Sequence, residues 1–381
     1  MNRYFRTKKT MLSILFMMIL GGVLFAQADD RYFDGLDKKS DVLTLTILYP
    51  SRGTLRSLQG LQEEGFFPAK DIIVVGAYHE KELTDYDASV DLAEEKNLDW
   101  LRFHEIRGDI HKDNLFQKND CTPDFEKIFQ YSDGIIFFGG ADIPPEIYGK
   151  KTNLLTGIHT PYRHYMELSF IFHLLGGYQD DHFEGFVASR PDFPVLCICL
   201  GEQTLNVGTG GTLIQDVWFE KYGKTFVEDV VELGLENWHN NPWARLYPQE
   251  EFLWFNMHRI NLYEEGMFVK AMGFSTSDTP YIISSHHQAV DELGKGMKVI
   301  ATSMDGKIVE AIQHDQYPNV LGIQFHPEFY ALWETEEKCR ITPDDEKFSL
   351  KQFLKDNPPT YKFHAKIWEW FVEGIQVQHN R

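Results

Sequence analysis

The sequence predicts an α/β fold in which a mostly parallel sheet is covered on both faces by helices. Strand-like and helix-like segments alternate from about residue 41, and the strand-like segments are short apolar runs, as expected for strands buried on both faces. The chain has 381 residues, of which 43% are hydrophobic, and its 29 Phe, 17 Tyr and 8 Trp supply a large core and exclude a disordered chain. We expect one domain over residues 41–381, with insertions, rather than two domains.

The first half of this domain carries the alternation. Residues 42–48 are rich in β-branched and aliphatic side chains and end at Tyr49-Pro50, which predicts a buried strand. Residues 54–64 have leucines at helical spacing and are closed by Gly65, which predicts a helix. The same criteria predict further strands at 71–75, 99–103 and 134–138 and a helix at 89–96.

Two regions break the alternation. Residues 218–255 are dense in aromatic and acidic side chains and have no clear period, and residues 335–359 are charged and carry Pro358-Pro359. We interpret both regions as surface insertions or lids over the core.

Residues 1–28 have the composition of an export signal. An apolar run over 11–25 is followed by Ala26-Gln27-Ala28, which offers small residues at the two positions that a signal peptidase inspects. The cations before this run are Arg3, Arg6, Lys8 and Lys9. Because the run is shorter than the roughly 20 residues that span a bilayer, an uncleaved anchor is the weaker alternative. The sequence therefore predicts an exported protein, periplasmic or extracellular, with no stable membrane span after processing.

The charge balance limits the partners. Lys+Arg 37 against Asp+Glu 57 gives a net charge of −20, and such a surface repels phosphate backbones and anionic lipid headgroups. We therefore expect no nucleic-acid partner and no role at a membrane surface. The sequence specifies no oligomeric state.

The strongest local motif is a strand that turns into a helix at Cys199. An apolar run over 194–198 leads into Cys199, and Gly201 and a helix-like segment over 203–207 follow. Such a turn holds a nucleophile at the carboxyl edge of the sheet, and the helix N-terminus favours the reactive thiolate. The backbone amide of Leu200 would then face a developing oxyanion.

A second motif, His326-Pro327-Glu328, ends an apolar strand-like run over 320–325. Residues two apart on an extended segment point to the same side, so His326 and Glu328 can approach one site. A thiol nucleophile needs a base that accepts and returns its proton, and the base needs a carboxylate that fixes its tautomer. These two residues are therefore candidates for base and orienting carboxylate.

Together with Gly139-Gly140, which follows the strand at 134–138, these motifs resemble the class I glutamine amidotransferase-like superfamily. Within it, the chain is most similar to the gamma-glutamyl hydrolase peptidase family, which includes the gamma-glutamyl-gamma-aminobutyrate hydrolases. The matching stretches, in the order in which the family has them, are residues 133–149, 194–216, 284–290 and 309–328.

This resemblance implies a flavodoxin-like three-layer α/β/α core and a site with two sets of residues. The implied catalytic triad is Cys199, His326 and Glu328. The implied oxyanion and substrate-binding residues are Gly139, Gly140, Leu200, Gln203, Ser285, His286 and His287. The chain departs from the family pattern at His164, where the Arg163–Glu167 helix is expected to carry Asp, and at Cys197, which replaces a glycine.

Together with the predicted export, the resemblance implies an exported cysteine hydrolase that cleaves gamma-glutamyl amide bonds of a small substrate through a thioester, with no cofactor and no metal. Hydrolysis is favoured over amido transfer, because export separates the enzyme from a synthase partner. Two alternatives are a non-catalytic secreted binding protein on the same fold and a glutamine amidotransferase subunit.

Other interpretations of the cysteines and histidines stay open. Cys197 and Cys199 are alternatively buried apolar side chains, or a Cys-x-Cys metal clip, for which no second pair has ligand spacing. Cys121 and Cys339 either form a disulfide or stay as thiols. The histidines His239, His258, His286 and His287 show no spacing typical of a metal ligand set, so we expect satisfied or surface side chains.

Overall fold

A ten-stranded sheet forms the centre of the computed structural model, which describes residues 31–37, 39–68, 71–333 and 338–381. The strand order is β3-β2-β1-β4-β5-β12-β11-β10-β7-β8. The strands are β1 (Leu43–Leu48), β2 (Ile72–His79), β3 (Leu101–Ile106), β4 (Gly134–Phe137), β5 (Val195–Ile198), β7 (Asn256–Leu262), β8 (Tyr281–Ser284), β10 (Met297–Ser303), β11 (Val309–His314) and β12 (Val320–Ile323). Two small ribbons pair β6 (Leu213–Ile214) with β9 (Ala289–Val290) and β13 (Lys338–Cys339) with β14 (Phe348–Ser349).

The sheet has a parallel and an antiparallel half. All pairs from β3 through β12 are parallel, whereas β12-β11, β11-β10, β10-β7 and β7-β8 are antiparallel. The predicted α/β fold class with a mainly parallel sheet is thus confirmed. The strands expected at 42–48, 71–75, 99–103 and 134–138 correspond to β1 to β4.

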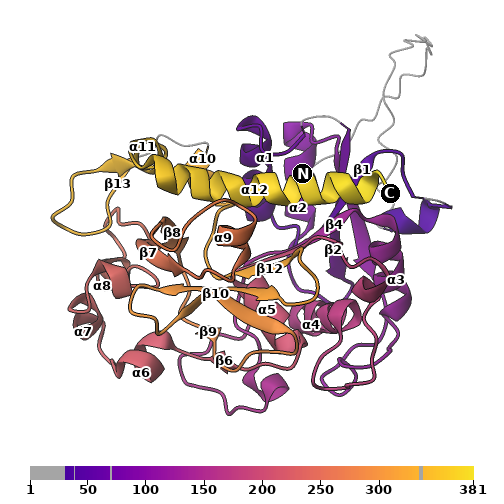
Figure 1. Ribbon diagram of the computed structural model, residues 1–381, viewed down its shortest axis with the longest axis horizontal. Helices are drawn as coiled ribbons and strands as arrows, with labels where there is room; N and C mark the ends of the chain where they lie inside the picture. Colours follow the sequence, from indigo (N-terminus) through magenta and orange to yellow (C-terminus); the bar gives the residue numbers. More distant parts are fainter. Residues whose placement is uncertain (1–30, 38, 69–70, 334–337) are drawn as a thin grey trace, which may run out of the picture.

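Helices cover both faces of the sheet (Figure 1). The helices whose apolar side chains join one core layer include α1 (Arg52–Glu63), α2 (Asp87–Lys96), α10 (Tyr330–Trp333), α11 (Leu350–Asp356) and α12 (Pro358–His379). The other layer contains α3 (Thr122–Tyr131), α4 (Pro161–Leu175) and α5 (Leu200–Gly208). On β2, Val74 and Val75 lie in opposite layers, because successive side chains of a strand point to opposite faces.

Helix α1 shows how the local sequence sets an element. The Ser51 side chain accepts a hydrogen bond from the amide of Thr54 at 3.3 Å and caps the N-terminus. Leu55, Leu58 and Leu61 lie on one face and are 0–2% exposed, so this stripe packs on the sheet. Gly65 then takes a left-handed φ of 84°, which ends the helical region as the sequence predicts.

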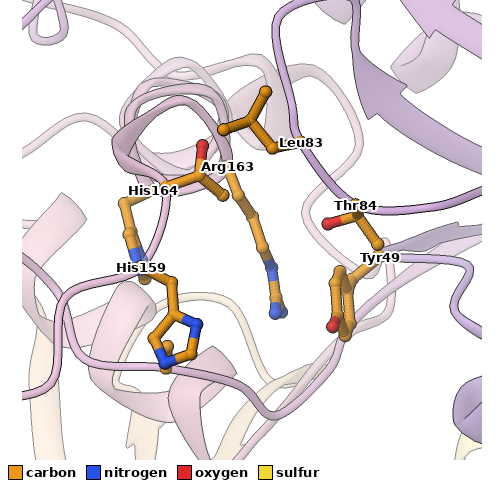
Figure 2. A pocket seen from close by; sticks show the side chains of 8 residues that line it. Tyr49, Leu83, Thr84, His159, Arg163 and His164 are labelled. Atoms are coloured by element: carbon orange, nitrogen blue, oxygen red, sulfur yellow. The ribbon is translucent and has the colours of Figure 1, made fainter.

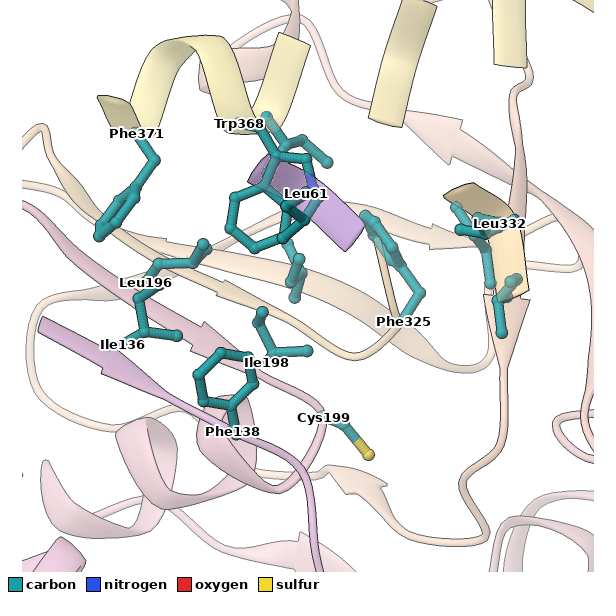
Figure 3. Close-up of a cluster of buried hydrophobic side chains, with 14 of the residues drawn as sticks. Leu61, Ile136, Phe138, Leu196, Ile198, Cys199, Phe325, Leu332, Trp368 and Phe371 are labelled. Atoms are coloured by element: carbon teal, nitrogen blue, oxygen red, sulfur yellow. The ribbon is translucent and has the colours of Figure 1, made fainter. Parts of the chain in front are cut away.

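The long helix α12 runs across one face of the molecule (Figure 1), contacts β1 and β4, and is hydrogen-bonded through Thr360 and His364 to Tyr281 of β8 in the antiparallel half. Its buried residues Trp368, Phe371 and Ile375 pack with Leu61 of α1 and Leu196 of β5. Figure 3 shows Trp368 and Phe371 in this cluster, with the Cys199 sulfur at the edge of the cluster and pointing away from it.

The segment 218–255 folds into short elements next to the antiparallel half (Figure 1). These are most of α6 (Val217–Tyr222), α7 (Val227–Val231), η4 (Leu235–Asn237) and α8 (Pro242–Leu246). The remaining short helices are α9 (Met267–Lys270), η1 (Tyr32–Gly35), η2 (Pro145–Tyr148) and η3 (Phe186–Ser189). The other expected insertion, 335–359, holds β13, β14 and α11, and its first residues, 335–337, lie outside the described residues.

The predicted export signal over 1–28 lies outside the described residues. Among the residues that are described, no helix combines the length and the apolar composition needed to cross a membrane. No disulfide joins Cys121, which is buried before α3, to Cys339 on β13.

Candidate active site

The turn at Cys199 lies at the carboxyl end of β5, between β4 and β12 in the parallel half. The amide of Cys199 donates to the carbonyl of Ile323 at 2.7 Å, which ties the turn to the end of β12. Cys199 has a φ of 54°, a left-handed value that a non-glycine residue rarely takes, and α5 begins at the next residue. The predicted strand-turn-helix is therefore present, with a strained backbone at the thiol.

Close packing explains the glycine after this turn. A Cβ atom on Gly201 would lie 2.3 Å from the carbonyl oxygen of Phe137 on β4. Only glycine lets α5 start this near to the neighbouring strand.

His326 and Glu328 follow β12 and form a tight pair. The two side chains are 8% and 7% exposed, and His326 Nδ1 donates to Glu328 Oε1 at 2.7 Å, since a carboxylate accepts. The other ring nitrogen, Nε2, lies 2.9 Å from Ser285 Oγ. Burial lowers the pKa of His326, but the Glu328 carboxylate and the Cys199 sulfur outweigh it and raise this pKa well above its usual value.

The thiol and the imidazole border the same small space beside Gly139. A Cβ atom on Gly139 would lie 3.1 Å from His326 Cε1 and 3.8 Å from Cys199 Sγ. The structure therefore brings together the three residues expected at the centre of the site, and a side chain at position 139 would fill the space between thiol and ring.

Two buried indoles fix the turn that carries His326 and Glu328. Trp333 Nε1 and Trp368 Nε1 donate to the carbonyl oxygen of Pro327 at 3.0 and 3.2 Å. Pro327 has no amide hydrogen of its own, and its carbonyl takes both donors. These positioning residues were not predicted, because tryptophans on two helices at the end of the chain carry no spacing signal for this role.

The loop after β4 is held by a buried ion pair. Arg163 Nη2 donates to the carbonyl oxygens of Phe138 and Gly139 at 2.8 and 3.0 Å, and Arg163 Nε donates to Glu167 Oε1 at 2.7 Å. Because the peptide bond is trans, the amide of Gly140 points away from Arg163 when the Gly139 carbonyl points toward it. A Cβ atom on Gly140 would lie 2.1 Å from Arg163 Nη1, so the loop requires glycine there.

His287 connects this loop to α6. Its Nε2 lies 3.0 Å from Asp142 Oδ2 and its Nδ1 lies 3.3 Å from Asp216 Oδ2, and Asp216 also caps α6. Burial lowers the pKa of His287, but the hydrogen bonds to the two carboxylates raise it to about 9. His287 therefore carries a positive charge at neutral pH and bridges two anions.

Gln203 and His286, both expected on the substrate side, are 4% exposed and bind protein groups. Gln203 Nε2 donates to Gln324 Oε1 at 3.1 Å and to the carbonyl of Gln288 at 3.4 Å. His286 Nδ1 donates to the same carbonyl at 2.8 Å. Both side chains thus hold the 284–288 loop in place through hydrogen bonds to the Gln288 carbonyl, whereas Ser285 of that loop contacts His326 directly.

The other thiols are unlike Cys199. Cys197 lies on β5 opposite Phe137 and Gly322 and belongs to the other core layer, so the two thiols of the Cys-x-Cys motif do not form a metal clip. Burial raises the pKa of Cys197 well above its usual value and that of Cys121 to about 12, so both stay as thiols.

A cavity of about 460 Å³ adjoins the Gly139-Gly140 loop. It is lined by Tyr49, Leu83, Thr84, Ala141, His159, Thr160, Arg163 and His164. Figure 2 shows the Arg163 side chain extending between His164 and Tyr49. His164, which departs from the family pattern, has a pKa lowered to about 3 by burial and by Arg163, so it is a neutral imidazole.

Comparison with known proteins places the chain in a family. The glutamine amidotransferase-like protein YvdE of Lactococcus lactis subsp. lactis is 31% identical over 218 residues, covering 57% of this chain and 74% of that protein. The glutamine amidotransferase-like protein RP404 of Rickettsia prowazekii is 30% identical over 224 residues, covering 53% of this chain and 73% of the relative.

A solved structure from Thermoplasma acidophilum, described as part of a GMP synthase, covers 88% of this chain and 95% of its own. Its identity of 13% and TM-score of 0.37 are too low to support a conclusion. The model of the family Peptidase C26 matches residues 115–328, which is more than half of the chain and includes Cys199, His326 and Glu328. The chain therefore belongs to the Peptidase C26 family, whose members resemble class I glutamine amidotransferases.

Proposed function

We propose that this protein is a cysteine hydrolase that cleaves gamma-glutamyl amide bonds through a Cys199–His326–Glu328 triad. One observation carries the proposal: a strained turn presents Cys199 Sγ beside His326, whose other ring nitrogen binds Glu328 at 2.7 Å. The raised pKa of His326 favours an imidazolium, the partner that a thiolate needs. Membership of a peptidase family supports the same chemistry.

The reaction starts with this thiolate–imidazolium pair. Cys199 Sγ attacks the carbon of the substrate amide, and the carbonyl oxygen takes the negative charge. His326 then gives its proton to the amine nitrogen as the carbon–nitrogen bond breaks, which leaves a thioester on Cys199 and a neutral imidazole.

Water completes the cycle. His326 takes a proton from a water molecule whose oxygen attacks the thioester carbon. The carbon–sulfur bond breaks, the glutamyl carboxylic acid leaves, and the thiolate–imidazolium pair is restored. Glu328 accepts the Nδ1 hydrogen throughout and keeps Nε2 directed toward the site.

In the proposed mechanism, two backbone amides hold the oxyanion. The amide of Leu200 belongs to the first turn of α5, where amides have no partner inside the helix. The amide of Gly140 points away from Arg163, which binds the preceding carbonyl. Such preorganised donors stabilise the transition state by about 3–4 kcal/mol each.

A turnover assay on the purified protein tests the proposal. The substrates are glutamine, gamma-glutamyl amides with neutral and with charged amines, and a poly-gamma-glutamyl peptide, and the readout is the appearance of both the amine and glutamate. We expect both products in equal amounts from at least one gamma-glutamyl amide and none from the Cys199→Ala variant.

Other outcomes of this assay favour other functions. Binding of a gamma-glutamyl compound without turnover would support a non-catalytic binding protein. If glutamine were the only substrate that reacts, with release of ammonia, the result would support an amidotransferase subunit. The names of the relatives also suggest this role.

We further propose that residues 1–28 are removed during export. The cationic start, apolar run and Ala26-Gln27-Ala28 support this. Intact-mass measurement on protein from the native host is expected to give a chain that starts at Asp29, and a full-length mass in that preparation would refute the proposal.

A further inference from the structure

Three histidines surround one buried carboxylate in the antiparallel half of the sheet. Glu310 lies on β11, His258 on β7, His239 in the loop after η4, and His286 in the loop after β8. Glu310, His239 and His258 are 0% exposed and His286 is 4% exposed. Four separate segments thus bring these side chains together away from the Cys199 turn.

The polar atoms that face one another in this cluster make no hydrogen bonds among the described residues. They are Nδ1 of His239, Nε2 of His258, Nε2 of His286 and both carboxylate oxygens of Glu310. A buried polar atom without a partner costs about 1–3 kcal/mol, and the cost is larger for a charged group. Five such atoms gathered in one buried cluster indicate that a cation belongs among them.

The hydrogen bonds outside the cluster fix how the rings are protonated. His258 Nδ1 lies 3.0 Å from the Arg259 carbonyl, and His286 Nδ1 lies 2.8 Å from the Gln288 carbonyl, so each Nδ1 carries the hydrogen. The lone pair of each Nε2 then faces Glu310. This outward hydrogen bond is the arrangement that orients metal-binding histidines.

The distances between donor atoms fit a metal. Glu310 Oε1 lies 3.3 Å from His239 Nδ1 and 3.6 Å from His258 Nε2, and Glu310 Oε2 lies 3.7 Å from His286 Nε2. The donor atoms of the first three residues all lie within 4.8 Å of one another. A tetrahedral zinc ion with bonds of about 2.0–2.1 Å separates neighbouring donors by about 3.3–3.4 Å.

We propose that His239, His258 and Glu310 bind a divalent transition metal ion, zinc by ligand type, while His286 lies beside the other carboxylate oxygen of Glu310. Imidazole and carboxylate donors suit zinc, and the complete burial of all three residues favours a structural over a catalytic ion.

The metal would hold the loop that reaches the Cys199 turn. The His286 amide and the Ser284 hydroxyl both donate to the carbonyl of His239, at 2.9 and 2.8 Å. Ser285, between them, contacts His326 Nε2 at 2.9 Å. An ion bound by His239 thus fixes the residue whose carbonyl anchors residues 284 and 286, and so sets the position of Ser285.

The first test is metal content. The purified protein is dialysed against a chelator, loaded with zinc sulfate alone, passed through a desalting column and measured by inductively coupled plasma mass spectrometry. We expect about one zinc ion per chain, and a rise of the melting temperature by about 5 °C over the chelated protein. Less than about 0.1 zinc per chain would overturn the proposal and leave a buried histidine–carboxylate network without metal.

Variants locate the ion. Glu310→Gln keeps the shape of the side chain and removes its charge, and we expect it to bind no zinc and to lose the zinc-dependent melting shift. His182→Gln, at an exposed histidine in another part of the chain, is the matched control and is expected to keep both. Should Glu310→Gln fail to fold, His258→Gln provides the same comparison. Full zinc binding in a folded Glu310→Gln or His258→Gln variant would contradict the assignment.

Discussion

Two regions of the same sheet combine histidine with glutamate in different ways. In the parallel half, His326 donates directly to Glu328 at 2.7 Å, its Nε2 contacts Ser285 Oγ at 2.9 Å, and its Cε1 borders the space beside Gly139 and Cys199. In the antiparallel half, His239 and His258 lie 3.3 and 3.6 Å from Glu310 without a hydrogen bond to it. The first geometry suits transfer of a proton, and the second leaves room for an ion.

Exposure follows the same division. His326 and Glu328 retain 8% and 7% of their surface, which allows a substrate to reach them, whereas Glu310 and His258 retain none. Histidine and glutamate can therefore serve different roles in the two regions. A hydrogen bond between the side chains suits proton transfer, whereas lone pairs that face one another suit a bound ion.

The largest expected effect comes from the nucleophile. Cys199→Ala is expected to lower kcat by at least about 10⁴-fold, since the covalent route is lost, without changing the melting temperature by more than a few degrees. Cys197→Ala, at the neutral buried thiol two residues earlier, is the matched control and is expected to retain activity. Equal losses in both variants would show that packing, not nucleophilic attack, explains the effect.

The paired carboxylates give a reciprocal test of the comparison. Glu328→Gln is expected to lower kcat by about 10²–10⁴-fold, because the His326 tautomer is no longer fixed, while zinc content stays at the wild-type level. Glu310→Gln is expected to lose zinc. Measuring kcat and zinc content on both variants tests whether the two sites are independent. Loss of zinc in Glu328→Gln would show that they are not.

A smaller effect is expected at the loop that positions the oxyanion. Gly140→Ala introduces a Cβ that would lie 2.1 Å from Arg163 Nη1, and we expect kcat to fall by about 10²-fold as the amide shifts. Gly53→Ala in α1, where the nearest atom lies 3.8 Å away, is the control and is expected to leave kcat unchanged. An unchanged kcat in Gly140→Ala would exclude this amide from the oxyanion site.

The smallest effect concerns a carboxyl group with no imidazole beside it. Glu82 binds the His79 amide and the Tyr86 hydroxyl, with Arg163 and Glu167 nearby, and burial raises its pKa to about 7 from the model-peptide value of 4.5. The folded protein holds this proton more tightly, so the contribution of Glu82 to stability is greatest below pH 4.5 and falls as the pH rises toward 7.

Glu82→Gln removes that dependence. We expect the variant to gain roughly 1–2 kcal/mol over wild type between acidic and neutral pH, measured by urea unfolding at several pH values. If the free energy of unfolding varied with pH in the same way for the two proteins across this range, the raised pKa of Glu82 would be contradicted.

The residues of the Cys199 turn could be predicted because each follows a strand at the same sheet edge. Cys199 and His326 stand directly after apolar runs, and the carboxyl ends of parallel strands meet. Membership of the Peptidase C26 family bears out the coarser part of the predicted resemblance. The gamma-glutamyl specificity and the export of the protein stay predictions.

The rest depends on pairings that local sequence does not encode. The antiparallel strands β7, β8 and β10 bring His258 and His286 to Glu310 from distant positions, so no ligand spacing exists to be found. The indoles of Trp333 and Trp368 meet the Pro327 carbonyl only after two helices pack on the sheet. Such contacts arise from tertiary structure and leave no periodic pattern.

The central claim, that Cys199 is the nucleophile for a gamma-glutamyl substrate, is tested most directly by labelling with a glutamine analogue that carries an electrophilic ketone at the side-chain position. The protein is treated below neutral pH, digested and examined by mass spectrometry, with free glutamine as competitor. The account predicts one adduct, on Cys199, that forms more slowly when glutamine is added or when Glu328 is changed to Gln. An unlabelled Cys199, or labelling that falls on Cys339 at the same rate and ignores glutamine, would contradict it.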